Sequence, residues 1–537
     1  MAPGFDVIVV GSGFGGAVTA CRLAQAGASV LVLERGRRWT KDQYPRGPGD
    51  AWLYQPGHPH RYNGWLDLRF ARGMTVAQGA GVGGGSLCYS SVVMKADPAL
   101  FEGGWPPEIT YSELAPYYAK VHEMLAVREI PPGQHTHRYK LLQRAAERLG
   151  HTDRFDSVPL ALSFDPEWSY ELPDPLDTRH SRSFVNGQGQ PQGTCVHLGN
   201  CDIGCDVQAK NTLDLNYIPA AEQHGAEVRP LHLVRCIQPD DSGYRVIFDR
   251  IEDGGLLRGE ERAERVVVAA GSLGSTELLL RCRDQHRTLP RISGVLGRHW
   301  SANANFFTSG IYGPDTEVGQ SIGPTIAAGL DFMDGSVNGQ RFFVEDDGFP
   351  NLLLNALTAQ LRSGRVSPFA WALQRHLRRG RDEKNPTRNV MVWLGEGVDA
   401  ADGELSLGRR RLMPWKRKLR LTWDVRRSAP VIDAILSTHQ RLTEATGGHL
   451  RVPLSWSVLR SLVTVHPLGG CRVGTGPEEA VVDHRGEVFG HRNLFVADGA
   501  IVPVAIGRNP SMTIGALAER TAALMTQGRG LSETEPL

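Results

Sequence analysis

Short apolar runs alternate with glycine-rich turns and amphipathic stretches along this chain, a pattern typical of alternating strands and helices. The first run, Phe5–Val10, is apolar and β-branched, and it predicts a buried parallel strand. Helical spacing follows over Ala17–Ala26, with Gly27 as a stop, and Ser29–Leu33 predicts a second strand. The chain therefore opens with a predicted βαβ unit.

The same style returns in the middle and at the end of the chain. Arg265–Ala270 predicts an apolar strand, followed by glycines and a helical run at Thr276–Arg281. Near the end, Asn493–Ala497 predicts a strand and Ser511–Met525 a helix. Other expected elements are helices at Tyr111–Ala126 and Asn211–Gln223 and strands at Glu227–Ile237, Asn389–Leu394 and Lys418–Trp423.

These segments predict an α/β fold, α+β overall, with a discontinuous nucleotide-binding domain of Rossmann type. We assign residues 1–44, 71–95, 207–300 and 461–537 to that domain. The inserted substrate domain, built on a mixed or antiparallel β-sheet with helices, takes residues 45–70, 96–206 and 301–460.

Composition and charge narrow the class of protein. The 537 residues are 41% hydrophobic and 22% charged, as in ordinary globular domains, and the formal net charge of +1 gives no case for nucleic acid as a partner. We expect no transmembrane segment, because no apolar stretch reaches about 18 residues. The first strand starts almost at the N-terminus, so we expect no leader and a cytoplasmic location.

The turn after the first strand carries Gly11-x-Gly13-x-x-Gly16. In such a turn the first glycine permits the tight bend, the second lets a pyrophosphate approach the backbone, and the third lets the helix pack closely. The helix N-terminus then faces the phosphates. Glu34 lies at the end of the second strand, where a ribose-binding carboxylate is expected. This context indicates a dinucleotide site.

Three cysteines, Cys195, Cys201 and Cys205, lie close together, with His197 between the first two. Thiolates at this density suit zinc or an iron–sulfur cluster. Neither cysteine pair has the C-x2-C spacing of zinc sites, which favours a turn with buried thiols and no metal.

Several blocks then carry a family resemblance. Besides the first glycine turn and Glu34, they are Gly81-Val-Gly83-Gly84-Gly85-Ser86, Ala269-Ala-Gly-Ser-Leu-Gly274, His466-Pro-Leu-Gly-Gly-Cys471, and Asp498-Gly499 with Asn509-Pro510. In this order and over nearly the whole chain, the sequence resembles the glucose–methanol–choline (GMC) oxidoreductase family, in its cholesterol oxidase-like branch.

The resemblance implies FAD as the cofactor. Covalent members use a histidine just after the glycine loop, and Leu87-Cys88-Tyr89 stands here, so a non-covalent FAD is expected. The residues that would contact it are Gly11, Ser12, Gly13, Phe14, Gly15, Gly16, Glu34, Arg35, Gly81, Gly83, Gly84, Gly85, Ser86, Tyr89, Val234, Ala270, Gly271, Asp498, Gly499, Asn509, Pro510 and Met512.

The resemblance also implies oxidation of an alcohol, with hydride transfer to the flavin. Such a site needs a proton acceptor and a donor that fixes the oxygen. His466 is the candidate acid/base and Asn509 the candidate donor, since an imidazole titrates near neutral pH and an amide N–H carries no charge. Glu345 is the candidate for moving a proton during isomerisation, with a solvated acidic turn as the alternative.

Two departures from cholesterol oxidases put sterol specificity in doubt: Tyr89-Ser90-Ser91 ends the glycine loop, and Ser511 follows Asn509-Pro510. The expected substrate is a bulky, largely apolar secondary alcohol, such as a steroid, with oxygen or another compound as electron acceptor. Two alternatives remain: a flavin-dependent steroid or enone isomerase with no net oxidation, and an electron-transfer subunit with a cluster on the three cysteines.

Overall fold

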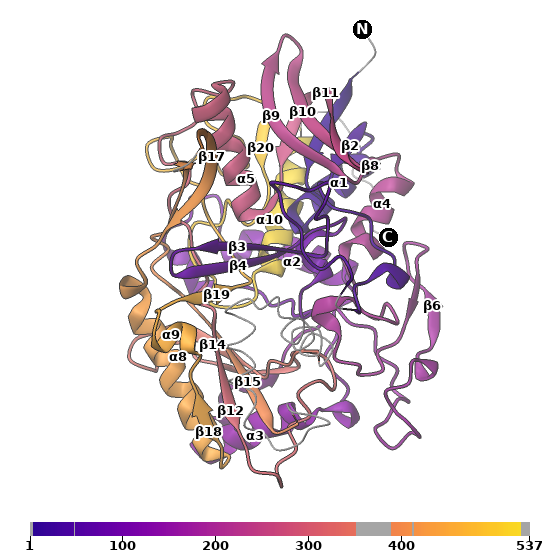
Figure 1. The fold of residues 1–537 in the computed structure, drawn as a ribbon, viewed down its shortest axis with the longest axis vertical. Coiled ribbons are helices and arrows are strands. Elements are labelled where there is room, and N and C mark those ends of the chain that lie inside the picture. Colours follow the sequence, from indigo (N-terminus) through magenta and orange to yellow (C-terminus); the bar gives the residue numbers. More distant parts are fainter. Residues whose placement is uncertain (1–3, 48, 351–387, 411–412, 528–537) are drawn as a thin grey trace.

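The computed structural model describes residues 4–47, 49–350, 388–410 and 413–527. Two sheets form most of the structure. One has the Rossmann-type parallel core, the other lies at the opposite end of the molecule, and the β3–β4 hairpin lies between them (Figure 1). The active-site candidates lie where these two parts meet.

The first sheet has a parallel core drawn from the start, middle and end of the chain. Its strands, in spatial order, are β8 (Glu227–Arg229), β2 (Val30–Leu33), β1 (Phe5–Val10), β11 (Gly255–Val268) and β20 (Leu494–Val496). The first part of β11 forms an antiparallel meander with β10 (Gly243–Glu252) and β9 (His232–Asp240). Buried Val, Ile and Leu side chains fill the parallel core, as expected for a sheet covered on both faces.

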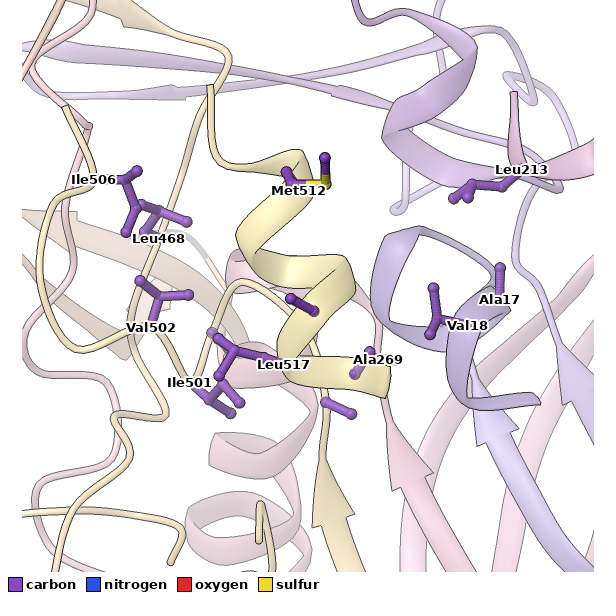
Figure 2. Close-up of a cluster of buried hydrophobic side chains, with 14 of the residues drawn as sticks. Ala17, Val18, Leu213, Ala269, Leu468, Ile501, Val502, Ile506, Met512 and Leu517 are labelled. Carbon is purple, nitrogen blue, oxygen red and sulfur yellow. The ribbon is translucent and has the colours of Figure 1, made fainter. Parts of the chain in front are cut away.

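Helices from distant parts of the chain pack beside this sheet. They are α1 (Phe14–Gln25), α2 (Tyr111–Met124), α4 (Tyr217–Gln223), α5 (Gly271–Leu280) and α10 (Ser511–Thr526). Figure 2 shows α10 next to α1, with Val18 on α1 and Leu517 on α10, near Ile501, among the buried apolar side chains. The buried carboxylate of Glu519 accepts hydrogen bonds from Arg22 and from the Tyr217 hydroxyl, which ties α10 to α1 and α4.

The second sheet is antiparallel. Its strands, in spatial order, are β18 (His449–Arg451), β12 (Phe306–Ile311), β15 (Val390–Gly397), β14 (Phe342–Glu345), β13 (Ala328–Asp331) and β5 (Phe155–Ser157). Helix α8 (Val425–Ala445) packs on β12, β14, β15 and β18, and α3 (His137–Leu149) packs on α8 and β13.

Strand β15 presents different residues to its two faces. Gly395 and Gly397 face α8 so closely that a Cβ on Gly395 would lie 2.2 Å from Cγ2 of Ile435. Because successive side chains alternate in a strand, Leu394 and Glu396 point to the opposite face. That face turns toward the cavity described below.

Smaller elements complete the fold. Strands β3 (Leu66–Ala71), β4 (Met74–Gly79) and β19 (Leu462–Thr464) form a sheet, and β16 (Glu404–Arg410) pairs with β17 (Met413–Thr422) and β6 (Ser183–Val185) with β7 (Pro191–Gly193). A short helix, α9 (Leu454–Ser457), precedes β19.

The predicted α/β class with a Rossmann-type sheet is confirmed. The prediction of one strand over Glu227–Ile237 was wrong: Pro230 and Leu231, with φ of 62° at Leu231, divide it into β8 and β9. The helix expected over Asn211–Gln223 begins only at Tyr217. The assigned domain bounds stay a prediction.

Candidate active site

A cavity of about 1050 Å³ lies between the two sheets, large enough for a dinucleotide and part of a substrate. Most of the predicted site residues line it, namely Gly11, Ser12, Gly13, Phe14, Gly15, Glu34, Arg35, Gly84, Gly85, Tyr89, Val234, Ala270, Gly271, His466, Asp498, Gly499, Asn509 and Pro510. Gly16, Gly81, Gly83, Ser86, Met512 and Glu345 do not line it, and the Met512 side chain lies in the apolar cluster of Figure 2.

The glycine turn between β1 and α1 leaves room for an anion. A Cβ on Gly15 would lie 1.6 Å from the Ala497 oxygen and one on Gly16 2.1 Å from the Gly11 oxygen, so both glycines are required for packing. At Gly13, in contrast, only the Gly84 Cα lies within 4 Å of such a Cβ, at 3.9 Å. Since α1 has no acidic residue in its first turn, its amides suit a pyrophosphate.

Glu34 organises this turn. Its carboxylate accepts hydrogen bonds from the Ser12 amide at 3.1 Å, the Ser12 hydroxyl at 2.8 Å and the Gly36 amide at 2.8 Å. The Ser12 hydroxyl in turn accepts from the Gly83 amide at 3.2 Å, which joins the second glycine loop to the first. The carboxylate of Glu34 thus already stabilises the glycine turn, and its binding to a ribose stays a prediction.

Asp498 lies just after β20 and contacts the segment that follows β11. It accepts hydrogen bonds from the Gly271 amide at 2.8 Å, the Ser275 hydroxyl at 2.5 Å and the Ala500 amide at 2.8 Å. Burial raises the pKa of Asp498, whereas these donors lower it. The ends of β11 and β20 are thereby held together at the cavity wall.

Lys210 anchors the second glycine loop, and sequence reasoning missed it. Its ammonium is buried and donates to the carbonyl oxygens of Leu87 at 2.8 Å, Tyr89 at 3.1 Å and Cys201 at 2.5 Å. Burial lowers the pKa of Lys210. No sequence signal separates this lysine from a surface one.

The cysteine segment lies beside that anchor. In the part of the chain that the structure describes, no group of three His, Cys, Asp or Glu side chains is placed to hold a metal ion. Both ring nitrogens of His197 have other partners, the Tyr170 hydroxyl at 3.2 Å and the Gln134 side-chain oxygen at 3.0 Å. Burial lowers the pKa of His197 to about 3.

His466 and Asn509 both line the cavity, and both contact Glu396. Nδ1 of His466 lies 3.0 Å from Oε1 of Glu396 and 3.1 Å from Nδ2 of Asn305. No described residue hydrogen-bonds to Nε2, and His466 lines the cavity. The ring therefore has one nitrogen fixed by the protein and one available to a ligand.

Asn509 is oriented by the same carboxylate. Its Nδ2 donates to Oε1 of Glu396 at 3.0 Å and to Oε2 of Glu345 at 3.5 Å, and its Oδ1 is buried without a partner among the described residues. The amide N–H that we expected to contact a substrate is thus directed to two glutamates. If the Asn509 amide were turned over, its Oδ1 would face the carboxyl oxygens of Glu345 and Glu396, so the orientation with Nδ2 on that side is favoured.

Glu345 and Glu396 form a buried carboxyl pair. They occupy diagonal positions on β14 and β15, and neither is exposed. Burial, and then the negative charge of Glu396, raise the pKa of Glu345 well above its usual range. Sequence reasoning missed Glu396, although a glutamate two residues after Leu394 on an apolar strand is an unusual placement.

Further polar residues and apolar side chains complete the wall. Asp202 and Asp347 line the cavity, and burial raises the pKa of Asp202 to about 6. Burial and the nearby Asp202 raise the pKa of Asp347.

The cavity is also lined by three residues at which the sequence departs from cholesterol oxidases, Tyr89, Ser90 and Ser511. The apolar lining includes Val92, Phe307, Ile326, Leu394 and Val465.

The residues present fit FAD. The open space beside Gly13, the free helix N-terminus and the backbone of Val234 lie in one continuous cavity with His466 and Asn509. FAD would supply an electron acceptor for two electrons from a bound substrate.

Comparison with known proteins gives the following matches. The GMC oxidoreductase family model matches residues 412–518, and a model of the NAD(P)-binding Rossmann-like domain matches residues 9–41. A cholesterol oxidase of Acinetobacter baumannii is 29% identical, with 98% of this chain and 96% of that protein covered. One of Mycobacterium tuberculosis is 28% identical, with 98% and 91% covered. The structure of an Aspergillus oryzae formate oxidase matches with a TM-score of 0.64 and 14% identity over 98% of this chain and 99% of that one, which supports the fold.

Proposed function

Because the chain is an FAD-dependent oxidoreductase of the GMC family, we propose that it oxidises a bulky, largely apolar secondary alcohol, such as a steroid, to a ketone. The observation that carries this proposal is the position of His466, whose Nε2 has no described partner, in the same cavity as the phosphate-binding turn. The names of the two cholesterol oxidases support the steroid class.

The chain's own groups divide the work. His466 takes the hydroxyl proton at Nε2, since its other nitrogen is held by Glu396. Phe307, Leu394 and Val465 offer apolar contact and exclude water near the reacting carbon. Bound FAD would accept the hydride, as expected for this class of flavoenzyme.

The cofactor is proposed to be held without a covalent bond. Leu87 and Cys88 follow the second glycine loop, and no histidine stands there to form a link. The backbone amides of the glycine turn would hold the pyrophosphate, and Gly84 and Gly85, which line the cavity, would lie over the flavin.

None of the helices in the described part of the chain combines the length and apolar character that a bilayer crossing requires.

The test is anaerobic mixing of the purified flavoprotein with sterols and long-chain alcohols. Substrates should bleach the flavin band, with secondary apolar alcohols fastest, and reoxidation by air should show whether oxygen is the acceptor. A protein that takes up no FAD, or that no alcohol bleaches, would contradict the proposal. Isomerised product without bleaching would instead favour an isomerase.

A further inference from the structure

The carboxylate of Glu396 is the meeting point of three side chains. Its Oε1 accepts from Asn509 Nδ2 at 3.0 Å and lies 3.0 Å from His466 Nδ1, and its Oε2 lies 3.4 Å from Asn303 Nδ2. Asn303 is itself fixed, because its Oδ1 accepts from the amides of Ile506 and Gly507 at 2.9 and 2.8 Å. Glu396 is therefore placed by the chain segment that leads into Asn509.

The donors around the carboxyl pair indicate which member is ionised. Glu396 receives hydrogen bonds on both oxygens, as an acceptor-only carboxylate requires. Glu345 has one contact at 3.5 Å, and its Oε1 has no partner among the described residues. Two adjacent buried carboxyls do not both ionise, so Glu345 holds the proton and Glu396 the charge.

Two neighbours compete for Nδ1 of His466. Asn305 presents Nδ2 at 3.1 Å, and the Val465 amide fixes this orientation by donating to Oδ1 of Asn305 at 3.1 Å; the Thr464 hydroxyl lies 2.9 Å from the same oxygen. A hydrogen bond from Asn305 requires a lone pair on Nδ1 and therefore a proton on Nε2. A hydrogen bond to Glu396 requires a proton on Nδ1 and leaves the lone pair on Nε2.

We propose that Glu396 is a positioning residue that selects the tautomer of His466: the proton stays on Nδ1 and the Nε2 lone pair faces the cavity. The hydrogen bond from Nδ1–H of the neutral ring to the ionised carboxylate of Glu396 is charge-assisted, so it outweighs the contact with the neutral amide of Asn305. The effect of this tautomer on the reaction rate rests on the proposed function. Bound FAD would accept the hydride as the alcohol becomes a ketone; the alcohol's proton goes to Nε2, and the imidazolium that forms lies against Glu396.

The first experiment replaces Glu396 by methionine, which has similar length and removes the acceptor at Nδ1. Asn305 then becomes the partner of Nδ1, and Nε2 carries the proton. We expect the rate of anaerobic flavin reduction to fall by about 10²–10⁴-fold. The FAD content should be unchanged, and the apparent Kd of the alcohol should change by less than about threefold, because the substrate-binding wall is intact.

The matched variant returns the carboxylate from the neighbouring position. Asn305→Asp keeps the oxygen that accepts from Thr464 and Val465 and places a second oxygen near Nδ1. The double variant Asn305→Asp/Glu396→Met should reduce flavin at least about tenfold faster than Glu396→Met. If Glu396 had a purely structural role, the double variant would show no such recovery. A double variant that reduces flavin no faster than Glu396→Met would overturn the proposal, and so would a near-normal rate of flavin reduction in Glu396→Met.

A readout independent of turnover separates this inference from the proposed function. In the FAD-loaded wild type, NMR of protein labelled in the histidine ring nitrogens should place the His466 proton on Nδ1, with His466→Asn identifying its signal. A proton on Nε2 would overturn the assignment. If no alcohol reduces the flavin, the proposed function fails, and this spectrum still decides the tautomer.

Discussion

The glycine turn between β1 and α1 and the sheet face that carries Glu396 border the same cavity, yet they are built on different principles. The turn is local: Gly11, Gly13 and Gly16 do their work within six residues. The sheet face gathers Glu345, Glu396 and the neighbours of His466 from strands and loops far apart in the chain. The comparison predicts that variants of the turn change FAD retention and variants of the sheet face change the reaction rate.

The strongest test of this division is His466→Ala. The rate of flavin reduction by the best alcohol should fall by about 10²–10⁴-fold, because the proton acceptor is lost, while FAD stays bound. Anaerobic stopped-flow absorbance measures the rate, and the absorption spectrum measures bound FAD. The exposed His449→Ala serves as the control. Reduction at the wild-type rate would remove His466 from the mechanism.

The next largest effect is expected for Lys210→Met on the cofactor side. Three carbonyl oxygens, two of them in buried contacts, lose their donor, so the free energy of unfolding should fall by about 2–4 kcal/mol, and FAD should dissociate faster. Denaturant unfolding and the rate of FAD release into dilute solution measure the two effects. The exposed Lys41→Met is the control, and equal behaviour of both variants would show that the hydrogen bonds of Lys210 contribute nothing.

Gly13→Ala sharpens the comparison without disturbing the fold. The new methyl group meets only Gly84 Cα at 3.9 Å, so the fold should persist, but the methyl fills the space assigned to the pyrophosphate. FAD affinity should fall by about tenfold or more, equivalent to about 1.4 kcal/mol, with the reduction rate of the bound flavin unchanged. Titration of the apoprotein with FAD measures this. Gly133→Ala, whose methyl group would have no neighbour within 4 Å, should bind FAD normally.

The smallest effect concerns Glu345→Gln and is a pH dependence of stability. The folded protein holds a proton on Glu345 that the unfolded chain releases above the ordinary pKa of 4.5, so stability is lost as pH rises from 4.5 toward the raised pKa. The uncharged glutamine removes this loss. Tm should therefore rise by about 1–3 °C at pH 8 and by less at pH 4.5.

Thermal unfolding at both pH values measures this difference, with the exposed Glu123→Gln as the control. A Tm gain of the same size at pH 4.5 and pH 8 would contradict the assignment of the proton to Glu345.

Sequence patterns predicted the elements whose signals are local. Phe5–Val10 is a strand over the predicted residues, and the helix expected at Tyr111–Ala126 is present over Tyr111–Met124, because apolar spacing depends on neighbours in the chain. The prediction of a single strand over Glu227–Ile237 was wrong because its signal is not local. Its apolar run is continuous, but the positive φ at Leu231 sends its two halves to different places in the sheet.

The candidate site was predictable to the same extent. His466, Asn509 and the glycine turns stand in recognisable blocks. The partners that orient them do not: Glu396, Asn305 and Lys210 act through contacts that only strand pairing and loop packing create. A sequence pattern identifies reactive groups more readily than the groups that hold them.

The glycines of β15 have an engineering consequence. With no side chain at Gly395 or Gly397, the methyl groups of Ile435 and Val431 rest directly on the strand that bears Glu396 on its other side. Trimming or enlarging Ile435 should shift that backbone by fractions of an ångström. Helix α8, which lines no part of the cavity among the described residues, thus offers a remote handle for tuning catalysis without altering the chamber that receives the alcohol.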